Sequence, residues 1–173
     1  MTVSIPGRPE IVDLYDIPLR TLHGQAATLA EHRGKALLVV NVASQCKLAT
    51  QYAGLQALHQ QFSARGFSVL GFPCNQFLDK EPGTPEEIST FTTSQYSVAF
   101  PLYEKLNVNY PDRHPLFERL ITVNDDDGAA GDVEWNFEKF LVAPTGDPVA
   151  RFRCLTAPDD PSLIAAVEAQ LPR

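Results

Sequence analysis

The clearest pattern in the chain is two short apolar runs separated by a stretch of helical periodicity. Residues 36–43 are almost continuously apolar and rich in β-branched side chains, which predicts a strand buried on both faces. Residues 49–64 carry apolar side chains at near-helical spacing, and Gly66 follows as a helix stop. Residues 67–73 form the second apolar run. This order predicts a β-α-β unit with two parallel strands and a right-handed crossover.

The region after this unit predicts two more helices. Residues 84–87 combine a threonine N-cap, a proline at the first helical position and a glutamate three residues after the cap, which is a strong helix start. The helix that follows places Ile88, Phe91 and Gln95 along one side. Residues 114–120 have the pattern of another, shorter helix.

The C-terminal part predicts a hairpin and a final helix. Residues 136–142 and 148–154 flank a Thr-Gly-Asp turn, as two antiparallel strands do, and a smaller hairpin is expected around residues 20–25. The last helix begins at Asp160 and is expected to bury Leu163, Ile164, Val167 and Leu171. The predicted fold class is therefore α/β, with a mixed central sheet flanked by helices. A single domain is expected to span residues 1–173.

The composition is that of a globular domain with a sizeable core, because 44% of the 173 residues are hydrophobic and 20% are charged. The net charge of −7 disfavours nonspecific binding to nucleic acid or to an anionic membrane surface. No apolar run approaches the roughly 20 residues that span a bilayer. Residues 1–10 lack the apolar stretch of a signal peptide. We therefore expect a cytoplasmic protein that binds neither nucleic acid nor a membrane.

The cysteines Cys46, Cys74 and Cys154 are not the disulfide-bonded set of a small secreted protein. Their number is odd, and a chain of this size needs no disulfide bonds to be stable. The sequence has no Cys-x-x-Cys motif and no histidine–cysteine cluster with the spacing of zinc ligands. The four histidines are scattered, and we expect each of them at a surface or structural position. No metal or organic cofactor is expected.

Cys46 has the setting of a reactive thiol. It lies between the first buried strand and the first helix, where unpaired backbone N–H groups converge and the helix end carries partial positive charge. Both features favour the thiolate, which is the reactive form of cysteine, and Lys47 adds a full positive charge. The alternative is that Cys46 is a small buried hydrophobic residue. Cys74 ends the second strand, so both thiols fall near the carboxyl edge of the sheet, where open α/β sheets place their sites.

Three segments together carry a more specific signal. They are residues 41–52 with Cys46, residues 71–83 with the run Phe-Pro-Cys-Asn-Gln-Phe before Glu-Pro-Gly, and residues 135–141 with Trp-Asn-Phe-Glu-Lys-Phe-Leu. Their order and spacing resemble the cysteine-containing branch of the glutathione peroxidase family, over nearly the whole chain. The resemblance implies a thioredoxin-like fold, in agreement with the mixed sheet predicted above.

The resemblance also implies a role for individual residues. Cys46 corresponds to the peroxidatic cysteine, and Trp135 and Asn136 correspond to the residues that hydrogen-bond to its sulfur. An indole N–H is only a donor and an amide NH₂ supplies two donors, so both groups stabilise a sulfur anion. The alternative for Trp135 is that of a core aromatic residue.

Lys80 stands where the family has a catalytic glutamine before Glu-Pro-Gly. A lysine donates to a thiolate but accepts no hydrogen bond, so it can replace only the electrostatic part of the role of glutamine. The alternative is that Lys80 pairs with Asp79 or Glu81 and points away. We place it among the catalytic residues.

Other positions also depart from the family pattern. Lys47 replaces a glycine, and it either attracts an acidic thiol or is a solvated side chain. Residues 91–96 lack the resolving cysteine of thioredoxin-dependent members, and Cys154 has no counterpart in the chemistry of the family. For Cys74 we favour a structural role over a disulfide with Cys46, which would need Cα atoms within roughly 7 Å.

An acidic segment resembles a calcium loop only in part. Asp125, Asp127 and Glu134 fit three ligand positions, but Val123 occupies the first position and offers no carboxylate. A solvated acidic loop is the favoured interpretation.

The sequence therefore predicts a thiol-dependent peroxidase that reduces hydrogen peroxide and organic hydroperoxides. Cys46 would cycle through a sulfenic acid, and an external thiol, either a glutathione-like small thiol or thioredoxin, would restore it. The expected state is a monomer. The rival functions are a peroxide sensor that passes oxidation to a partner protein and a thioredoxin-like binding module that has lost activity. A disulfide isomerase is disfavoured because Cys-x-x-Cys is missing.

Overall fold

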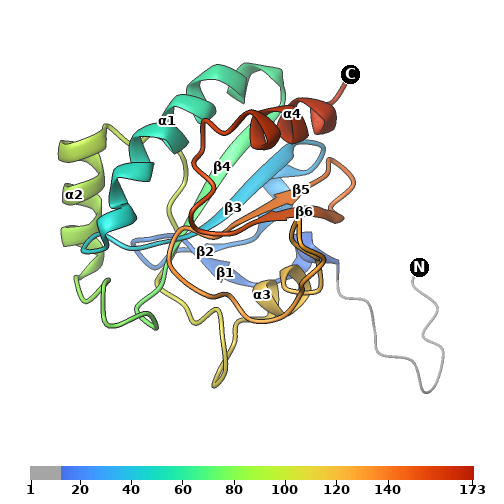
Figure 1. The fold of residues 1–173 in the computed structure, drawn as a ribbon. Helices are drawn as coiled ribbons and strands as arrows, with labels where there is room; N and C mark the ends of the chain where they lie inside the picture. The colour runs from blue at the N-terminus through green and yellow to red at the C-terminus, as the bar shows by residue number, and fades with distance from the viewer. Residues whose placement is uncertain (1–12) are drawn as a thin grey trace.

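The computed structural model describes residues 13–173. A four-stranded sheet lies at its centre, with the strand order β4-β3-β5-β6 (Figure 1). β3 pairs in parallel with β4 and antiparallel with β5, and β5 pairs antiparallel with β6. This confirms the predicted mixed sheet. The strands are β3 (Ala36–Val42), β4 (Phe67–Pro73), β5 (Lys139–Val142) and β6 (Pro148–Phe152).

Two hydrophobic clusters cover the two faces of the sheet, because successive strand residues point to opposite sides. On one face, α1 and α4 pack against a cluster that contains Leu38 and Val40. On the other face, α3 packs against a cluster that contains Leu37 and Val39. Helix α2 lies beside α1 (Figure 1). The helices are α1 (Gln51–Phe62), α2 (Pro85–Tyr96), α3 (Pro115–Leu120) and α4 (Pro161–Gln170).

The predicted helix signals act as expected. The Thr84 hydroxyl accepts a hydrogen bond from Glu87 N at 3.2 Å and starts α2. The Asp160 carboxylate accepts one from Ser162 N at 2.8 Å and starts α4. The turn after α1 ends at Gly66, which has the left-handed φ of 85° that favours glycine. The small hairpin is also confirmed, as β1 (Leu19–Arg20) pairs antiparallel with β2 (Ala26–Ala27).

Four boundaries and two burial predictions differ from the structure. β3 ends at residue 42 rather than 43, and β5 starts at residue 139 rather than 136, because Phe137 has a left-handed φ of 67° that no strand accommodates. β6 ends at residue 152 rather than 154, and a 3-10 turn occupies residues 47–50 before α1. Ile164 and Leu171, both expected to be buried, are only half-buried at the edge of the core.

Three of the histidines have structural roles, as predicted. His32 Nε2 lies 3.3 Å from the Tyr103 hydroxyl, and burial lowers the pKa of His32. His59 Nδ1 accepts a hydrogen bond from the amide of Val69 in β4. His114 Nδ1 accepts one from Leu116 N at 3.1 Å and caps α3.

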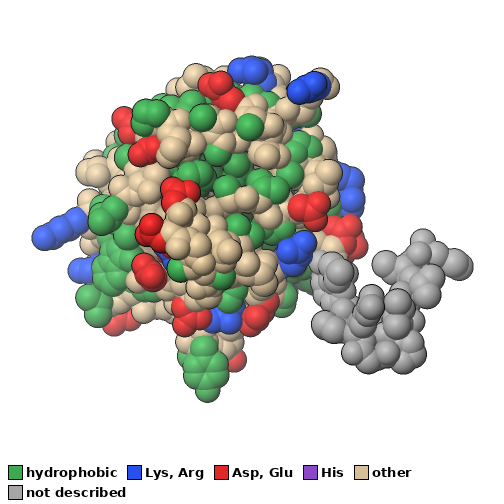
Figure 2. All heavy atoms as spheres, turned by 45° about the vertical axis from the view of Figure 1, so that its right-hand side comes forward, with side chains coloured by type: hydrophobic (Ala, Val, Ile, Leu, Met, Phe, Trp, Pro, Cys, Tyr) green, Lys and Arg blue, Asp and Glu red, His purple; other side chains and the backbone are tan. Residues whose placement is uncertain are grey.

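The surface carries more acidic than basic side chains, in line with the net charge of −7. On the face drawn in Figure 2, acidic groups are scattered among hydrophobic and neutral ones. None of the helices within residues 13–173 has the length and apolar character needed to cross a bilayer. The expectation that residues 1–10 carry no signal peptide lies outside the described residues.

Candidate functional site

Cys46 lies in the connection between β3 and α1, at the carboxyl edge of the sheet. It is the N-cap residue of the 3-10 turn that leads into α1, and its side chain is 7% exposed. The backbone N–H of Leu48 points at its sulfur, with Leu48 N 3.4 Å from Cys46 Sγ. A backbone donor in this position stabilises a thiolate, as expected for a cysteine at the start of a helix.

The loop that carries Cys46 is joined to the segment that contains Lys80. Gln45 N donates to the Lys80 carbonyl oxygen at 2.9 Å, and Glu81 N donates to Asn75 Oδ1 at 2.9 Å. Asn75 therefore shapes this turn. The Lys80 side chain is half-buried and forms no ion pair or hydrogen bond with another described residue, so the alternative in which it pairs with Asp79 or Glu81 is not seen. Lys47 is exposed.

Trp135 and Asn136 reach the site from the turn that precedes β5. Trp135 is half-buried, packs against the cluster that contains Cys46, and its ring lies 5.7 Å from the Phe77 ring between centroids. Asn136 is fully buried, and neither atom of its side-chain amide has a hydrogen-bond partner in the described part of the protein. A buried amide without partners costs stability, and its donor and acceptor atoms stay available to another group.

Asn41 of β3 fixes the backbone of this turn. Its side-chain Nδ2 donates to the Trp135 carbonyl oxygen at 3.0 Å, and its own carbonyl oxygen accepts a hydrogen bond from Phe137 N at 2.6 Å. These two bonds enclose Asn136 and replace the strand pairing that the sequence had predicted here. Asn41 is the one polar residue in an otherwise apolar strand, and that was the signal that it holds the Trp135–Phe137 turn. The sequence analysis treated it only as part of the strand.

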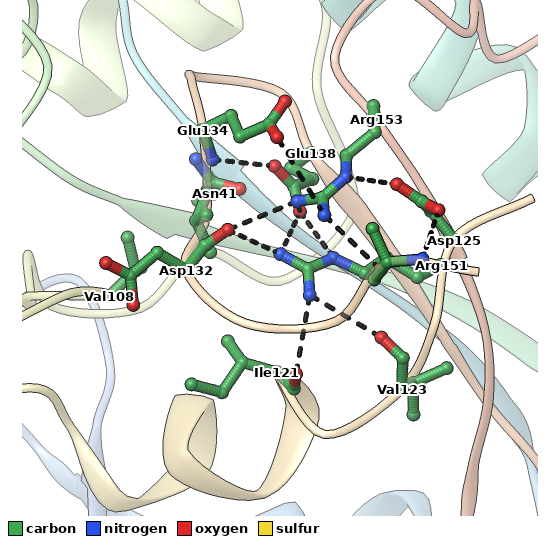
Figure 3. A network of polar contacts seen from close by, with 12 residues as sticks. Asn41, Val108, Ile121, Val123, Asp125, Asp132, Glu134, Glu138, Arg151 and Arg153 are labelled. Carbon is green, nitrogen blue, oxygen red and sulfur yellow. Dashed lines mark hydrogen bonds and ion pairs between the residues drawn. The ribbon is translucent and has the colours of Figure 1, made fainter. Parts of the chain in front are cut away.

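A buried ionic network holds the same turn from the other side (Figure 3). Glu138 and Arg151 are almost completely buried, and Glu138 Oε1 accepts hydrogen bonds from Arg151 Nε at 2.6 Å and from Arg153 Nη1 at 2.7 Å. Glu138 Oε2 accepts a hydrogen bond from Glu134 N, the residue before Trp135, at 2.9 Å. The network therefore anchors the backbone immediately before the indole.

The structure brings the predicted residues to one edge of the sheet without direct bonds to the sulfur. Within residues 13–173, the one hydrogen bond to Cys46 Sγ comes from Leu48 N, and Trp135, Asn136 and Lys80 make none. Sequence reasoning anticipated N–H groups at this turn but did not single out Leu48.

The two other cysteines lie in different surroundings. Cys74 is fully buried in the cluster on the opposite face of the sheet, and burial raises the pKa of its thiol. This placement fits the structural role that we favoured. Cys154 follows β6 and is half-buried, and burial raises its pKa while the neighbouring Lys139 opposes that rise. All three cysteines are free thiols.

The acidic loop is organised by protein contacts. Asp125 Oδ1 accepts hydrogen bonds from the amides of Asp127 and Ala129, both at 2.9 Å, and Asp125 Oδ2 accepts one from Arg153 Nε at 2.8 Å. The pKa of Asp125 is lowered by these hydrogen bonds, first by that from Ala129. Asp125 thus closes a turn and joins the ionic network.

A free cysteine at the carboxyl edge of a mixed sheet, with a backbone donor on its sulfur and a tryptophan packed against the same hydrophobic cluster, is typical of a thiol-dependent redox enzyme of the thioredoxin-like class. Comparison with known proteins narrows this class. The profile of the glutathione peroxidase family matches residues 14–121. The chain belongs to the glutathione peroxidase family, and it is a thiol-dependent peroxidase that reduces hydroperoxides.

The relatives cover most of the chain. It is 46% identical over 152 residues to the "Hydroperoxy fatty acid reductase gpx1" of Synechocystis sp., which covers 85% of this chain and 90% of that protein. It is 38% identical over 172 residues to the "Thioredoxin/glutathione peroxidase BtuE" of Escherichia coli, and the match covers 88% of this chain and 94% of that protein. Among solved structures, T. cruzi GPX1 superimposes with a TM-score of 0.70 at 29% identity, covering 91% of this chain and 97% of that one.

Proposed function

We propose that Cys46 is the peroxidatic residue and that Trp135, Asn136 and Lys80 assist it. The Cys46 thiolate attacks the terminal oxygen of a hydroperoxide, the S–O bond forms as the O–O bond breaks, and the oxygen that leaves takes up a proton to give water or an alcohol. Sulfur is oxidised to a sulfenic acid and the peroxide is reduced. The observation that carries this assignment is the Leu48 N–H directed at the sulfur of a cysteine that retains some exposure.

The assisting residues supply donors and positive charge. The indole N–H of Trp135 and the unpaired amide of Asn136 lie on the turn held against β3, where closer approach to Cys46 on substrate binding would let them stabilise the reacting charge. The Lys80 ammonium, which has no partner among the described residues, supplies positive charge for the departing oxygen. These roles rest on position and donor chemistry.

The substrates of this proposal include bulky organic hydroperoxides as well as hydrogen peroxide. The Synechocystis relative is named as a hydroperoxy fatty acid reductase. In this chain Leu78 is 75% exposed and follows Phe77, whose ring packs on Trp135. This apolar surface next to the proposed site favours a substrate with an apolar body.

An external thiol returns Cys46 to its reduced form in this proposal. A first thiol condenses with the sulfenic acid and releases water, and a second thiol attacks the resulting disulfide. Cys74 lies in the other core cluster and has no exposed surface, which disfavours an internal disulfide with Cys46. We propose that the protein acts as a monomer and uses glutathione, a similar small thiol, or thioredoxin.

The test is NADPH-coupled consumption of hydrogen peroxide and of a fatty acid hydroperoxide, with glutathione and thioredoxin systems in parallel. Cys46→Ser should abolish turnover with every donor, whereas the matched control Cys154→Ser should retain it. Turnover by Cys46→Ser would overturn the assignment. A Cys46–Cys74 disulfide in the mass spectrum of the oxidised protein would overturn the external-thiol step.

A further inference from the structure

A buried lysine lies between the two segments that form the candidate site. Lys139 of β5 is 0% exposed, and alternation along the strand places it on the same face as Leu141, which α1 and α4 cover. In the part of the chain that the structure describes, no carboxylate lies within 4.0 Å of its nitrogen. Lysine is rarely buried without a paired charge, because burying an ammonium group costs free energy. Two backbone carbonyl oxygens take the place of the carboxylate.

The first of these carbonyl groups belongs to the turn of residues 135–137, here called the indole turn. Lys139 Nζ donates to the Phe137 carbonyl oxygen at 2.6 Å. Asn41 holds the same turn at the Trp135 carbonyl oxygen and at Phe137 N. The backbone is therefore fixed on both sides of Asn136, whose side-chain amide has no partner among the described residues.

The second carbonyl group leads to residues 46–51, here called the thiol turn. Lys139 Nζ lies 3.5 Å from the Cys154 carbonyl oxygen, which also accepts a hydrogen bond from Gln51 Nε2 at 2.7 Å. The backbone N–H of Gln51 closes the thiol turn on the Leu48 carbonyl oxygen. Leu48 N in turn faces Cys46 Sγ at 3.4 Å. A continuous chain of hydrogen bonds thus joins the ammonium group to the turn that holds the thiol.

The indole turn and the thiol turn also lie close together in the core. Tyr52, the residue after the thiol turn, packs edge-to-face on Phe137, with 5.3 Å between the ring centroids. Both rings are fully buried. Burial lowers the pKa of Lys139 to about 8, while Cys154 and Glu138 oppose that fall, so the group is mostly protonated at pH 7.

We propose that Lys139 is a positioning residue whose ammonium group, by binding the carbonyl oxygens of Phe137 and Cys154, sets the separation of the indole turn and the thiol turn. Within residues 13–173, neither Trp135 nor Asn136 bonds to the sulfur of Cys46, so any help that they give depends on that separation. This inference rests on the roles proposed above for these three residues.

The proposal predicts a loss of rate when the link is broken at either end. Lys139→Met keeps an unbranched side chain and removes the donor, so the second-order rate constant for oxidation of Cys46 should fall about tenfold, the equivalent of roughly one hydrogen bond. Gln51→Leu leaves the bond to Phe137 intact, and its rate constant should fall about threefold. Because both residues act through one link, the double variant should be about tenfold slower, not about thirtyfold.

The experiment mixes each reduced protein with hydrogen peroxide, quenches the reaction at set times and counts oxidised Cys46 by mass spectrometry. Acrylamide quenching of Trp135, the single tryptophan, reports separately on the indole turn and should increase in Lys139→Met. Lys35→Met is the matched control, because it makes the same change just before β3, at the opposite end of that strand from Cys46. It should keep the wild-type rate constant and quenching.

Three results would overturn the inference. The first is a folded Lys139→Met protein with the wild-type rate constant, or Gln51→Leu with that rate constant if Lys139→Met does not fold. The second is a double variant slower by the product of the single losses, which would show that the two residues act independently. The third is an equal loss in Lys35→Met. All three leave Cys46 as the peroxidatic residue, whereas turnover by Cys46→Ser would remove the proposed function itself.

Discussion

Removing the carboxylate of Glu138 should be among the most damaging single changes outside the apolar core. Glu138 and Arg151 both have side chains with 0% exposure, so Glu138→Leu leaves a buried guanidinium without a carboxylate partner. Arg151 would then retain only backbone carbonyl oxygens, the nearest being that of Asp132 at 2.9 Å. Breaking a buried ion pair from one side costs about 3–5 kcal/mol.

Removing Arg151, the other partner of this ion pair, should destabilise the protein less than removing Glu138. Arg151→Met leaves Glu138 paired with Arg153 Nη1 at 2.7 Å and bonded to Glu134 N at 2.9 Å. The methionine also keeps part of the apolar contact with Phe140, over whose ring the guanidinium lies at 4.8 Å. We expect a loss of about 1–3 kcal/mol, the range for hydrogen bonds lost from buried groups.

The assay is urea unfolding of the two single variants and the double variant, followed by circular dichroism and by Trp135 fluorescence. The double variant should be less destabilised than the sum of the single variants, because no unpaired buried guanidinium remains at position 151. Peroxide reduction should fall in Glu138→Leu, since the anchor of Glu134 is lost. A loss below about 1 kcal/mol for Glu138→Leu would refute the reasoning.

Three further predictions follow from individual residues. Asn136→Leu should leave the free energy of unfolding unchanged or raise it by about 1–2 kcal/mol in urea titrations, because the native amide is buried without partners, while peroxidase activity falls; a large destabilisation would contradict this. Lys139 has a folded pKa of about 8 against 10.5 when exposed, so between these pH values the unfolded chain binds the extra proton and stability rises with pH. In urea unfolding between these two pH values, the free energy of unfolding of the wild type should rise by about 3 kcal/mol more than that of Lys139→Met. The same pH dependence in both proteins would disprove the prediction. Leu78→Gly should stabilise the protein by up to about 1 kcal/mol, because Leu78 has a left-handed φ of 53° that glycine adopts without strain, and its 75% exposed side chain packs little. A lower midpoint of thermal unfolding in Leu78→Gly would show that the backbone at Leu78 is not strained.

The sequence is most informative where local chemistry decides the structure. The apolar runs that became β3 and β4 are buried along their whole length, and the caps at Thr84 and Asp160 start helices as predicted. These features depend on residues close together in the chain. The expected strand from residue 136 fails because a contact with Asn41, distant in sequence, holds the turn out of the ladder.

Burial of charged residues is the part that sequence reasoning could not supply. Glu138, Lys139 and Arg151 are buried, although residues of these types are mostly exposed. Their burial depends on pairing between β5, β6 and the acidic loop, which joins segments far apart in the sequence. Glu81 entered the sequence analysis as part of the Glu-Pro-Gly run and as a partner for Lys80, and its burial was not predicted because it depends on how two loops meet.

The candidate site was predictable in its position but not in its contacts. The end of an apolar strand before a helix places Cys46 at the carboxyl edge, and the structure confirms this placement. Cys74 lies in the same cluster as Leu70 and Phe72, as the alternation along β4 dictates, whereas the face toward which the loop after β3 carries Cys46 could not be inferred.

The central claim is that peroxide oxidises the sulfur of Cys46 rather than that of another cysteine. The most direct measurement is mass spectrometry of the protein after a stoichiometric amount of hydrogen peroxide in the presence of dimedone, which traps sulfenic acids. The account predicts one dimedone adduct, on the peptide that contains Cys46. An adduct on Cys74 or Cys154 with Cys46 unmodified would contradict it.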